Sequence, residues 1–279
     1  MNRRKLPESF NTPTLFFQKR SHREAVNPLF RLKMDNARFW KSLIGTISAL
    51  LDEGNFNVDA EGIRLRSMDP SHVAMVDFEL SKDAVEEYSC SAPLKLCINI
   101  AEMLKLLRRV GGDESIELTY DPSKARLDIV LKSNYTRTFS IATLEPTTDE
   151  VPAPKIAFNA QARITTDCLK NAIDDAATVS DHIQFEMVEG KLVMRSSGDL
   201  GSATIEVEET SEELLNMAFS EPSQATFSLS YLSDMVKAAS GLSDIVTLEF
   251  STNMPIRLNF ELPQKGQLQY YLAPRIETA

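Results

Sequence analysis

Features that would indicate secretion, membrane insertion or metal binding are scarce in this chain of 279 residues. It has three cysteines (Cys90, Cys97 and Cys168), an odd number without the Cys-x-x-Cys spacing of zinc or redox sites, so buried thiols in a reducing compartment are expected. No apolar run approaches the roughly 18 residues that can span a bilayer, and the N-terminus lacks the apolar segment and cleavage site of a secretion signal. We therefore expect an intracellular protein that does not cross a membrane.

Signatures of catalysis are equally scarce. The chain contains neither a phosphate-binding G-x-x-x-x-G-K-[ST] loop nor a G-x-S-x-G nucleophile motif, and only three histidines are available as general bases. Asp69, His72 and Asp77 could be considered as a hydrolytic metal site, but their spacing does not place them on one face of a strand. No second His or Cys cluster completes such a site. The sequence therefore favours a protein that is not an enzyme and has no cofactor or metal.

The charge distribution separates a basic N-terminus from an acidic body. The net charge is −10, which argues against a protein that coats nucleic acid with its whole surface, because phosphate binding needs a concentrated cationic footprint. Residues 1–27 carry six basic and two acidic residues, or +4, which leaves −14 for the remainder. Any contact with an anionic partner must therefore be local.

The most informative feature present is an internal duplication at an offset of 129 residues. Apolar positions match by type at this offset, and several polar positions match as well: Lys41 with Lys170, Arg66 and Ser67 with Arg195 and Ser196, Arg108 with Lys237, and Gly112 with Gly241. Two of the matched basic pairs, Lys41 with Lys170 and Arg108 with Lys237, fall on the exposed faces of predicted helices. A cation kept on the exposed face of a repeated helix indicates a shared anionic partner.

The chain divides into four segments on this basis. Residues 1–27 have no periodicity and are expected to form a disordered extension. Residues 28–143 form the first repeat and residues 156–279 the second. The proline-rich segment 144–155 between them can form neither a helix nor a central strand, so we expect an interdomain linker there.

Hydrophobic periodicity predicts two helices per repeat, at 38–51, 100–109, 166–178 and 230–240. Alternating segments predict strands at 29–34, 56–58, 63–67, 73–80, 115–120, 126–132, 135–143, 183–188, 191–196, 203–208, 225–229, 245–250, 256–262 and 268–272. Each repeat is thus two helices against antiparallel strands. The expected fold class is α+β, with the helices segregated on one face of the sheets.

Two segments carry a resemblance to a known family. SMDPSHVAMVDFEL (Ser67 to Leu80) and YYLAPRIE (Tyr270 to Glu277) are similar to the corresponding strands and C-terminal tail of proliferating cell nuclear antigen, the sliding clamp of archaea and eukaryotes. The resemblance covers roughly residues 28–279, and the ending is more like that of archaeal members. It implies a DNA polymerase processivity factor: a head-to-tail trimeric ring of six similar domains around double-stranded DNA, nucleoid-associated in the cytoplasm of an archaeon or nuclear in a eukaryote.

The resemblance implies that the helices line the DNA hole. The cations expected on that surface are Arg38, Lys41, Lys105, Arg108, Arg109, Lys170 and Lys237. The resemblance adds Lys95 as a further DNA-facing residue, on the strand that leads into the second helix. Asp174, Asp175 and Asp234 dilute this positive charge. A modest charge suits sliding, because each tight phosphate contact would hold the ring in one place. Solvated helix faces without a ligand are the alternative interpretation.

A closed head-to-tail ring needs two different complementary surfaces on each subunit. The resemblance assigns them to two edge strands: Tyr135, Arg137, Phe139 and Ile141 on one, and Lys191, Val193 and Arg195 on the other.

The resemblance also implies a pocket under the linker for peptides of client polymerases, flap endonucleases and ligases. Its expected lining is Met68, His72, Val73, Met75, Leu144, Val151, Pro152, Met254, Pro255, Tyr271, Leu272, Ala273, Pro274 and Ile276. Without the resemblance, Met68, Val73 and Met75 would be assigned to the core. Burial of each apolar client anchor is worth about 1.5 to 3 kcal/mol, so micromolar affinity is expected after ordering costs.

Two further alternatives remain open from the sequence. The chain could be one subunit of a heterotrimeric clamp or of a damage-checkpoint ring, and a loading ATPase is implied as a partner in either case. In the N-terminal extension, the segment from Pro13 to Phe17 is faintly similar to a client peptide and could plug the pocket. A tail without structure or function is the alternative for that segment.

Overall fold

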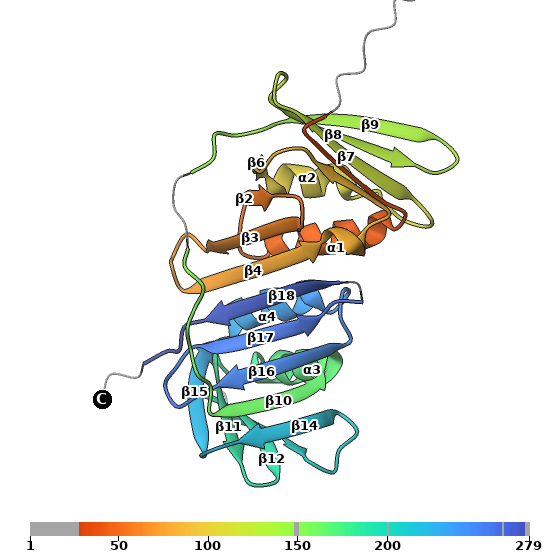
Figure 1. Ribbon diagram of the computed structural model, residues 1–279. Helices are drawn as coiled ribbons and strands as arrows, with labels where there is room; N and C mark the ends of the chain where they lie inside the picture. Colours follow the sequence, from red (N-terminus) through yellow and green to blue (C-terminus); the bar gives the residue numbers. More distant parts are fainter. Residues whose placement is uncertain (1–27, 148–150, 200, 264, 277–279) are drawn as a thin grey trace, which may run out of the picture.

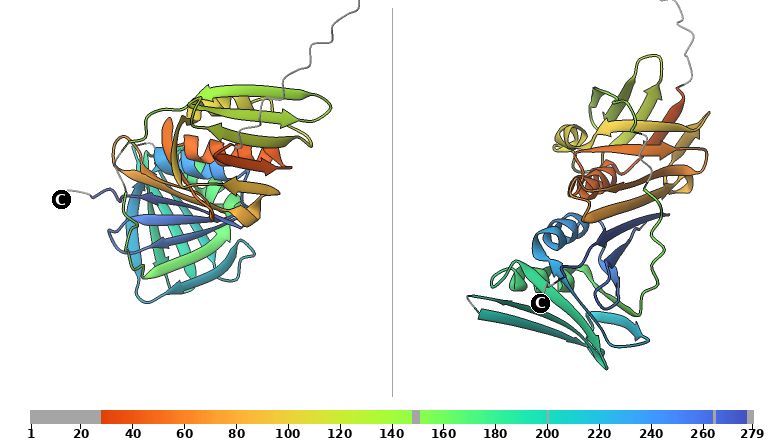
Figure 2. Two further views of the ribbon diagram at one scale, coloured as in Figure 1. Left: turned by 45° about the horizontal axis from the view of Figure 1, so that its top comes forward. Right: turned by 90° about the vertical axis from the view of Figure 1, so that its left-hand side faces the viewer.

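The computed structural model describes residues 28–147, 151–199, 201–263 and 265–276. These residues form four α-helices and 18 β-strands arranged in three antiparallel sheets (Figure 1). The helices of both halves lie on one side of the largest sheet, and the segment that links the halves runs along the other side (Figure 2, right). The α+β class with segregated helices is thereby confirmed.

The elements follow one another in the same order in both halves. The first half contains helices α1 (Ala37–Ser48) and α2 (Ile100–Leu107) and strands β1 (Phe30–Met34), β2 (Glu53–Val58), β3 (Gly62–Met68), β4 (Ala74–Ser81), β5 (Glu87–Cys90), β6 (Leu94–Asn99), β7 (Ser115–Asp121), β8 (Arg126–Lys132) and β9 (Thr136–Ala142). The second half contains helices α3 (Thr166–Ala176) and α4 (Leu229–Ala239) and strands β10 (Ala160–Thr165), β11 (His182–Val188), β12 (Lys191–Gly198), β13 (Gly201–Glu208), β14 (Leu214–Phe219), β15 (Ser223–Ser228), β16 (Ile245–Phe250), β17 (Ile256–Glu261) and β18 (Gly266–Leu272). Both helix pairs begin 129 residues apart, so the predicted duplication is confirmed.

Side-chain caps and apolar stripes explain where the helices form. The Asn36 carboxamide accepts a hydrogen bond from Phe39 N at 3.0 Å at the start of α1, and Asn99 accepts one from Glu102 N at 2.7 Å at the start of α2. Thr165 caps α3 in the same way, accepting from Cys168 N at 3.2 Å. Each helix buries one stripe, as α1 does with Trp40, Leu43, Ile44 and Ile47. The helices therefore pack as amphipathic elements against the sheets.

Sheet order shows that each half is built from a five-strand and a four-strand module. In the first half these modules are β5-β1-β7-β8-β9 and β4-β3-β2-β6, and in the second half β14-β10-β16-β17-β18 and β13-β12-β11-β15. The nine-stranded sheet forms because the five-strand module of the second half joins the four-strand module of the first, through β18 and β4. This joint leaves β9 and β13 as end strands of the other two modules.

Buried contacts reinforce the joint between the halves. The β18–β4 ladder runs from Gly266 opposite Leu80 to Leu272 opposite Ala74. The Tyr270 hydroxyl is fully buried and donates to the Thr46 carbonyl of α1 at 2.6 Å. Burial raises the pKa of this phenol, so it stays protonated and available as a donor. Helices α1 and α4 also contact each other across the joint.

Three strands, β5, β10 and β14, were not predicted from the sequence, and β6 was expected only from the resemblance, as the strand that carries Lys95. Strands β5 and β14 lie at sheet ends, and most of their residues are exposed or half-exposed, so they lack the apolar alternation of a strand with one buried face. In β10 the buried face is made of small residues, Ala160 and Ala162, beside Ile164. In β6 three consecutive residues, Leu96, Cys97 and Ile98, are buried, which masks the period of two.

The predicted N-terminal extension and its Pro13 to Phe17 segment lie outside the described residues. The domain boundaries drawn from the sequence stay predictions. No described helix is long and apolar enough to cross a membrane.

Candidate nucleic-acid interface and peptide pocket

Exposed cations gather on the helices of the first half. Arg38 projects from α1, Lys105 from α2, and Arg108 and Arg109 follow the end of α2; all four are exposed. None of the four forms an ion pair with another described residue. This surface can therefore offer unneutralised positive charge to an anionic ligand.

Lys41 has a different role from the one predicted. It is half-buried, and its Nζ donates to the carbonyl oxygens of Arg108 at 2.9 Å and Val110 at 3.1 Å. These carbonyls lie just beyond the end of α2, where unpaired backbone oxygens and the helix dipole favour a cation. Lys41 thus ties α1 to α2 and is not one of the freely displayed cations.

The second half neutralises its equivalent lysines. Asp174 lies 3.5 Å from Lys170 within α3 and 3.1 Å from Lys237 of α4. The hydrogen bond from Lys237 and the charges of both lysines lower the pKa of Asp174, so this carboxylate stays ionised. The two helices are therefore joined by a shared carboxylate.

Lys95 does not belong to the helix surface. It lies on β6 opposite Asn57 of β2, and both side chains line a cavity on the outer face of the nine-stranded sheet. Its neighbour Leu96 points the other way, into the core. Because side chains alternate along a strand, Lys95 faces away from the helices. Lys95 does lie on the strand that leads into α2, but its side chain faces away from the helices, so its prediction as a DNA-facing residue is wrong.

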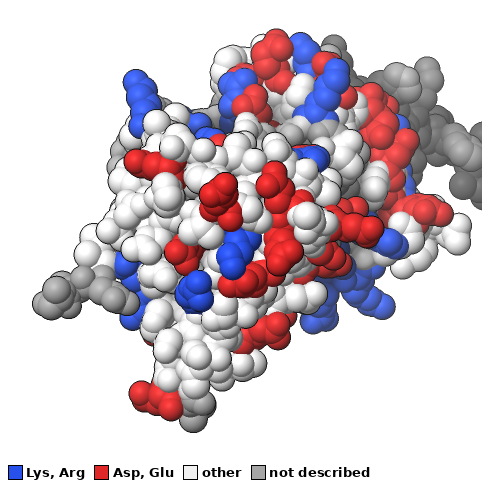
Figure 3. Space-filling model, turned by 90° about the horizontal axis from the view of Figure 1, so that it is seen from below, with Lys and Arg blue, Asp and Glu red and all other residues white. Residues whose placement is uncertain are grey.

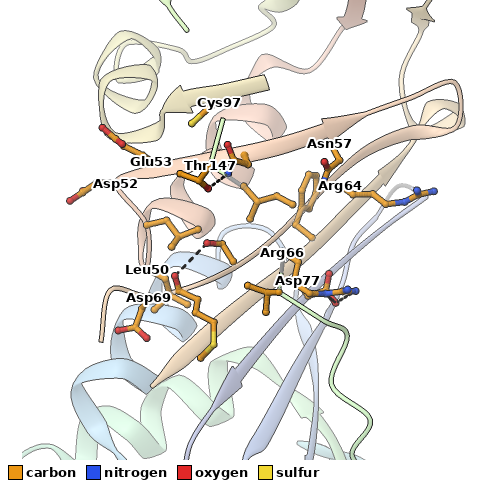
Figure 4. A pocket seen from close by; sticks show the side chains of 18 of the residues that line it. Leu50, Asp52, Glu53, Asn57, Arg64, Arg66, Asp69, Asp77, Cys97 and Thr147 are labelled. Carbon is orange, nitrogen blue, oxygen red and sulfur yellow. Dashed lines mark hydrogen bonds and ion pairs between the residues drawn. The ribbon is translucent and has the colours of Figure 1, made fainter. Parts of the chain in front are cut away.

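That cavity, of about 1250 Å³, lies between the linker and the strands β2, β3, β4 and β6 (Figure 4). Four residues predicted for the peptide pocket meet in it: Met68, His72, Val151 and Pro152. It is also lined by Leu50 and Leu51, which follow the end of α1. Asn55 fixes the linker over it by donating to Thr147 Oγ1 at 2.6 Å.

A row of side chains extends this site across the sheet. Met68 of β3 lies opposite Met75 of β4, Met75 opposite Tyr271 of β18, and Tyr271 opposite Arg257 of β17. Met75 and Tyr271 are buried but lie outside the main core cluster, as expected for the outer sheet face. The sheet therefore brings residues about 200 positions apart in sequence onto one surface.

The C-terminal tail continues from β18 beside the loop 69–73. Ala273 N donates to the Val73 carbonyl at 2.9 Å, and Arg275 N donates to the Thr226 carbonyl at 2.7 Å. The Arg275 guanidinium also pairs with Asp181 at 2.9 Å. Hydrogen bonds to His182 and Arg275 lower the pKa of Asp181 to about 2. Next to Arg275, Ile276 leaves 77 % of its surface exposed, an unusual position for a large apolar side chain.

The loop 69–73, which the tail contacts, is held in place by Asp69. Its carboxylate accepts hydrogen bonds from the backbone of Ser71, Val73 and Ala74 at 2.7 to 3.0 Å and from the Tyr231 hydroxyl of α4 at 2.9 Å. Burial raises the pKa of the Asp69 carboxyl, but these hydrogen bonds outweigh burial and the net pKa is lowered. His72 adopts a φ of 57° in this turn. Tyr231 was not singled out in the sequence, because its partner lies 162 residues away.

Asp69 was considered above as a metal ligand, and here its oxygens serve as backbone and tyrosine acceptors. Among the described residues, no group of three or more His, Cys, Asp or Glu side chains could hold a metal ion.

Several predicted pocket residues lie elsewhere. Leu272 is 1 % exposed and belongs to the core cluster on the helix side of the sheet, so its assignment to the pocket is wrong. Leu144 begins the linker by donating its N–H to the Cys97 carbonyl at 2.9 Å. Met254 and Pro255 lie in the turn between β16 and β17, with Met254 42 % exposed. Pro274 is half-buried in the tail.

The edge strands that are available for assembly differ in part from those predicted. Strand β9, with Arg137, Phe139 and Ile141, is an end strand, and Tyr135 just before it is 64 % exposed. Strand β12, which holds Lys191, Val193 and Arg195, pairs with β11 on one side and β13 on the other. Its backbone groups are therefore occupied, and the predicted second edge is wrong by one strand. The end strand of that sheet is β13.

Family models account for almost all of the described chain. The N-terminal domain of proliferating cell nuclear antigen matches residues 29–148, and the C-terminal domain of the same family matches residues 153–275. The chain belongs to the proliferating cell nuclear antigen family. The resemblance found in the sequence is thereby confirmed.

Relatives named as DNA polymerase sliding clamps are similar to this chain over nearly their whole length. The chain is 35 % identical over 242 residues to DNA polymerase sliding clamp 1 of Pyrobaculum aerophilum, covering 87 % of this chain and 96 % of that protein. It is 36 % identical over 246 residues to the DNA polymerase sliding clamp of Methanococcus vannielii, covering 87 % and 98 %. The crystal structure of proliferating cell nuclear antigen from Thermococcus kodakaraensis superposes with a TM-score of 0.84 at 25 % identity, covering 88 % of this chain and all of the other. The family is that of DNA polymerase sliding clamps.

Proposed function

We propose that this protein is a processivity factor that closes into a homotrimeric ring around double-stranded DNA and tethers polymerases, flap endonucleases and ligases. A clamp-loading ATPase would place it on DNA, and the protein itself would be non-catalytic, as its family is. The observation that carries the proposal is the complementary pair of unused sheet edges, β9 and β13.

The joint inside the chain supplies the template for the joint between chains. Strand β18 occupies the same place in its five-strand module as β9, and β4 the same place in its four-strand module as β13. The β18–β4 joint therefore supports a model in which the β9 edge pairs with the β13 edge of a neighbouring copy. Three copies joined head to tail in this way would give six similar domains in a closed ring.

Side chains on the two edges fit this pairing. On β9, Ile141 is buried and Phe139 half-buried; on β13, Val207 is buried and Ile205 half-buried. Extension of the sheet would cover the apolar surface that remains and pair the free backbone groups of both edges. The helices of every domain would then line the inside of the ring, since all four lie on one side of the nine-stranded sheet.

The pocket under the linker suits an extended peptide with apolar anchors. Met68, Leu50 and Leu51 provide apolar lining, and the linker and the loop 69–73 border the cavity. The wide cavity is partly polar, which is consistent with exchangeable clients of micromolar affinity.

Topological retention on DNA tests the proposal. The labelled protein would be loaded on nicked circular DNA by a clamp-loading ATPase and isolated by gel filtration, and the circle would then be cut with a restriction enzyme. Retention on the circle and rapid loss after cutting would support encirclement. Equal retention on circular and cut DNA, or none on either, would contradict it.

A further inference from the structure

The two repeats differ at a helix position that places a carboxylate between two lysines in one repeat only. Gly45 lies four residues after Lys41 in α1, and Asp174 lies four residues after Lys170 in α3, at the repeat offset of 129 residues. Residues four apart are neighbours on a helix surface. Asp174 therefore meets Lys170 at 3.5 Å and also reaches Lys237 at 3.1 Å, whereas Gly45 offers no carboxylate to the equivalent residues of the first repeat.

The difference extends over both helix pairs. Residues 37–48 and 100–109 carry five basic residues and one acidic residue, or +4. The equivalent residues 166–177 and 229–238 carry two lysines and four aspartates, or −2. The surface is therefore cationic on the first repeat and slightly acidic on the second. Acidic side chains are also numerous on the end of the second half (Figure 3).

We propose that contact with DNA phosphates is confined to the helices of the first repeat, with Asp174 holding Lys170 and Lys237 back from the DNA. This inference rests on the proposed function, since it concerns a ring that surrounds DNA. It makes Asp174 a positioning residue that lowers the affinity of the ring for the DNA duplex. The ring would present three cationic arcs alternating with three weakly acidic arcs.

The physical consequence is a looser hold on the duplex. Each lysine that contacts a phosphate releases a condensed counterion and adds about 0.9 to the slope of log affinity against log salt concentration. Asp174 competes with the phosphate for two lysines per chain. Because exposed ion pairs are weak, the competition is modest and adjusts affinity without abolishing it. Retention would come from ring closure, which leaves the surface free to favour sliding.

Asp174→Asn removes this carboxylate, and Asp175→Asn is the matched control. Asp175 is exposed in the same helical turn and forms no ion pair with another described residue, so both variants change the net charge equally. We expect Asp174→Asn to bind a short linear duplex two- to five-fold more tightly at low salt, with a salt slope steeper by about 1. The diffusion coefficient of the loaded ring along DNA should fall by a similar factor. Asp175→Asn should change each quantity by less than half as much.

The reciprocal variant places the carboxylate in the first repeat. A Cβ atom added at Gly45 meets nothing within 4 Å, so Gly45→Asp fits sterically, and Gly45→Asn is its uncharged match. Gly45→Asp should weaken duplex binding two- to five-fold and speed sliding relative to Gly45→Asn. Unchanged solution mass and melting temperature would show that the ring itself is intact.

The outcomes separate this inference from the proposed function. A wild-type protein that is not retained on circular DNA would contradict the proposed function. Wild-type retention, together with identical binding, salt slope and diffusion of Asp174→Asn and Asp175→Asn, would overturn only the restraining role of Asp174. Equal effects of Gly45→Asp and Gly45→Asn would overturn the assignment of contact to the first repeat.

Discussion

The two repeats have the same order of elements but join their helices by different chemistry. In the first repeat the Lys41 ammonium binds backbone carbonyls beyond the end of α2, and in the second repeat the Asp174 carboxylate joins Lys170 to Lys237. In the first repeat the remaining cations stay exposed, whereas in the second repeat Asp174 neutralises both lysines. One fold can thus keep its helix packing while it changes the charge of the surface that the helices present.

The repeats differ in a second way, in the use of their sheet edges. Strands β18 and β4 are paired within the chain, while β9 and β13 are sheet ends. A duplicated unit with one internal joint necessarily leaves one copy of each edge unused. This asymmetry is what a ring needs and what an isolated monomer would have to protect from aggregation.

The largest expected effect comes from placing a charge on the free edge. Ile205→Lys introduces an ammonium group at a half-buried position of β13, where pairing with β9 would desolvate it. We expect the trimer to dissociate into folded monomers, as measured by light scattering. Thr204→Lys, on the exposed opposite face of the same strand, is the control and should stay trimeric. A trimeric Ile205→Lys protein would show that β13 is not the interface.

Equivalent residues on the paired and the free edge should differ in their effect on folding. Leu272 lies opposite Ile256, and Ile141 lies opposite Leu127, so the two occupy matching places on β18 and β9. Leu272→Ala should destabilise the fold by about 2 to 5 kcal/mol, because it leaves a cavity at the internal joint. Ile141→Ala, made in the Ile205→Lys protein, should lower the free energy of unfolding by less. In that monomer no strand of a neighbouring copy covers the β9 edge. Denaturant unfolding measures both, and equal losses would contradict the distinction between the edges.

Loss of the hydrogen bond between Tyr231 of the second repeat and Asp69 of the first should have a smaller effect. Tyr231→Phe removes only the hydroxyl that donates to Asp69, which leaves a buried carboxylate short of one hydrogen bond. A loss of about 1 kcal/mol, or roughly five-fold in affinity for a client peptide, is expected. Calorimetric titration with a client peptide provides the measurement, and duplex DNA binding serves as the internal control. Peptide affinity equal to that of the wild type would show that the loop 69–73 does not need this bond.

The smallest expected effects come from breaking the contact that joins the two helices in each repeat. Lys41→Met removes two hydrogen bonds to backbone carbonyls and should destabilise the fold by about 0.5 to 1.5 kcal/mol. Lys170→Met breaks an exposed ion pair and should cost less than about 0.5 kcal/mol. Thermal unfolding of both variants would show the contrast. A larger loss for Lys170→Met would reverse the proposed roles of the two lysines.

Local patterns predicted much of this fold. The period of Phe39 to Leu51 and the overlay of Lys41 on Lys170 are properties of nearby residues or of a fixed offset, so the helices and the duplication could be read directly. The joint between β18 and β4 pairs residues 186 to 198 positions apart, and no local pattern encodes such a register. The resemblance to the family supplied the prediction of a peptide pocket that includes Met68 and Tyr271, but not which face Leu272 or Lys95 occupies.

Side-chain partners explain the remaining differences. Lys41 has the pattern of an exposed cation, and only the position of the α2 end shows that it binds carbonyls. Asp69 carries a carboxylate, which is a common metal ligand, and only the turn and Tyr231 show that its oxygens serve as hydrogen-bond acceptors. Both roles depend on elements brought together by folding, and for that reason the sequence did not reveal them.

The solution mass of the purified chain, by size-exclusion chromatography with light scattering, tests the central claim most directly. Three copies of a 31.2 kDa chain would weigh about 94 kDa, and the complementary β9 and β13 edges predict this mass. A monomer of about 31 kDa at micromolar concentration would contradict the homotrimer and would indicate a subunit that assembles only with paralogues.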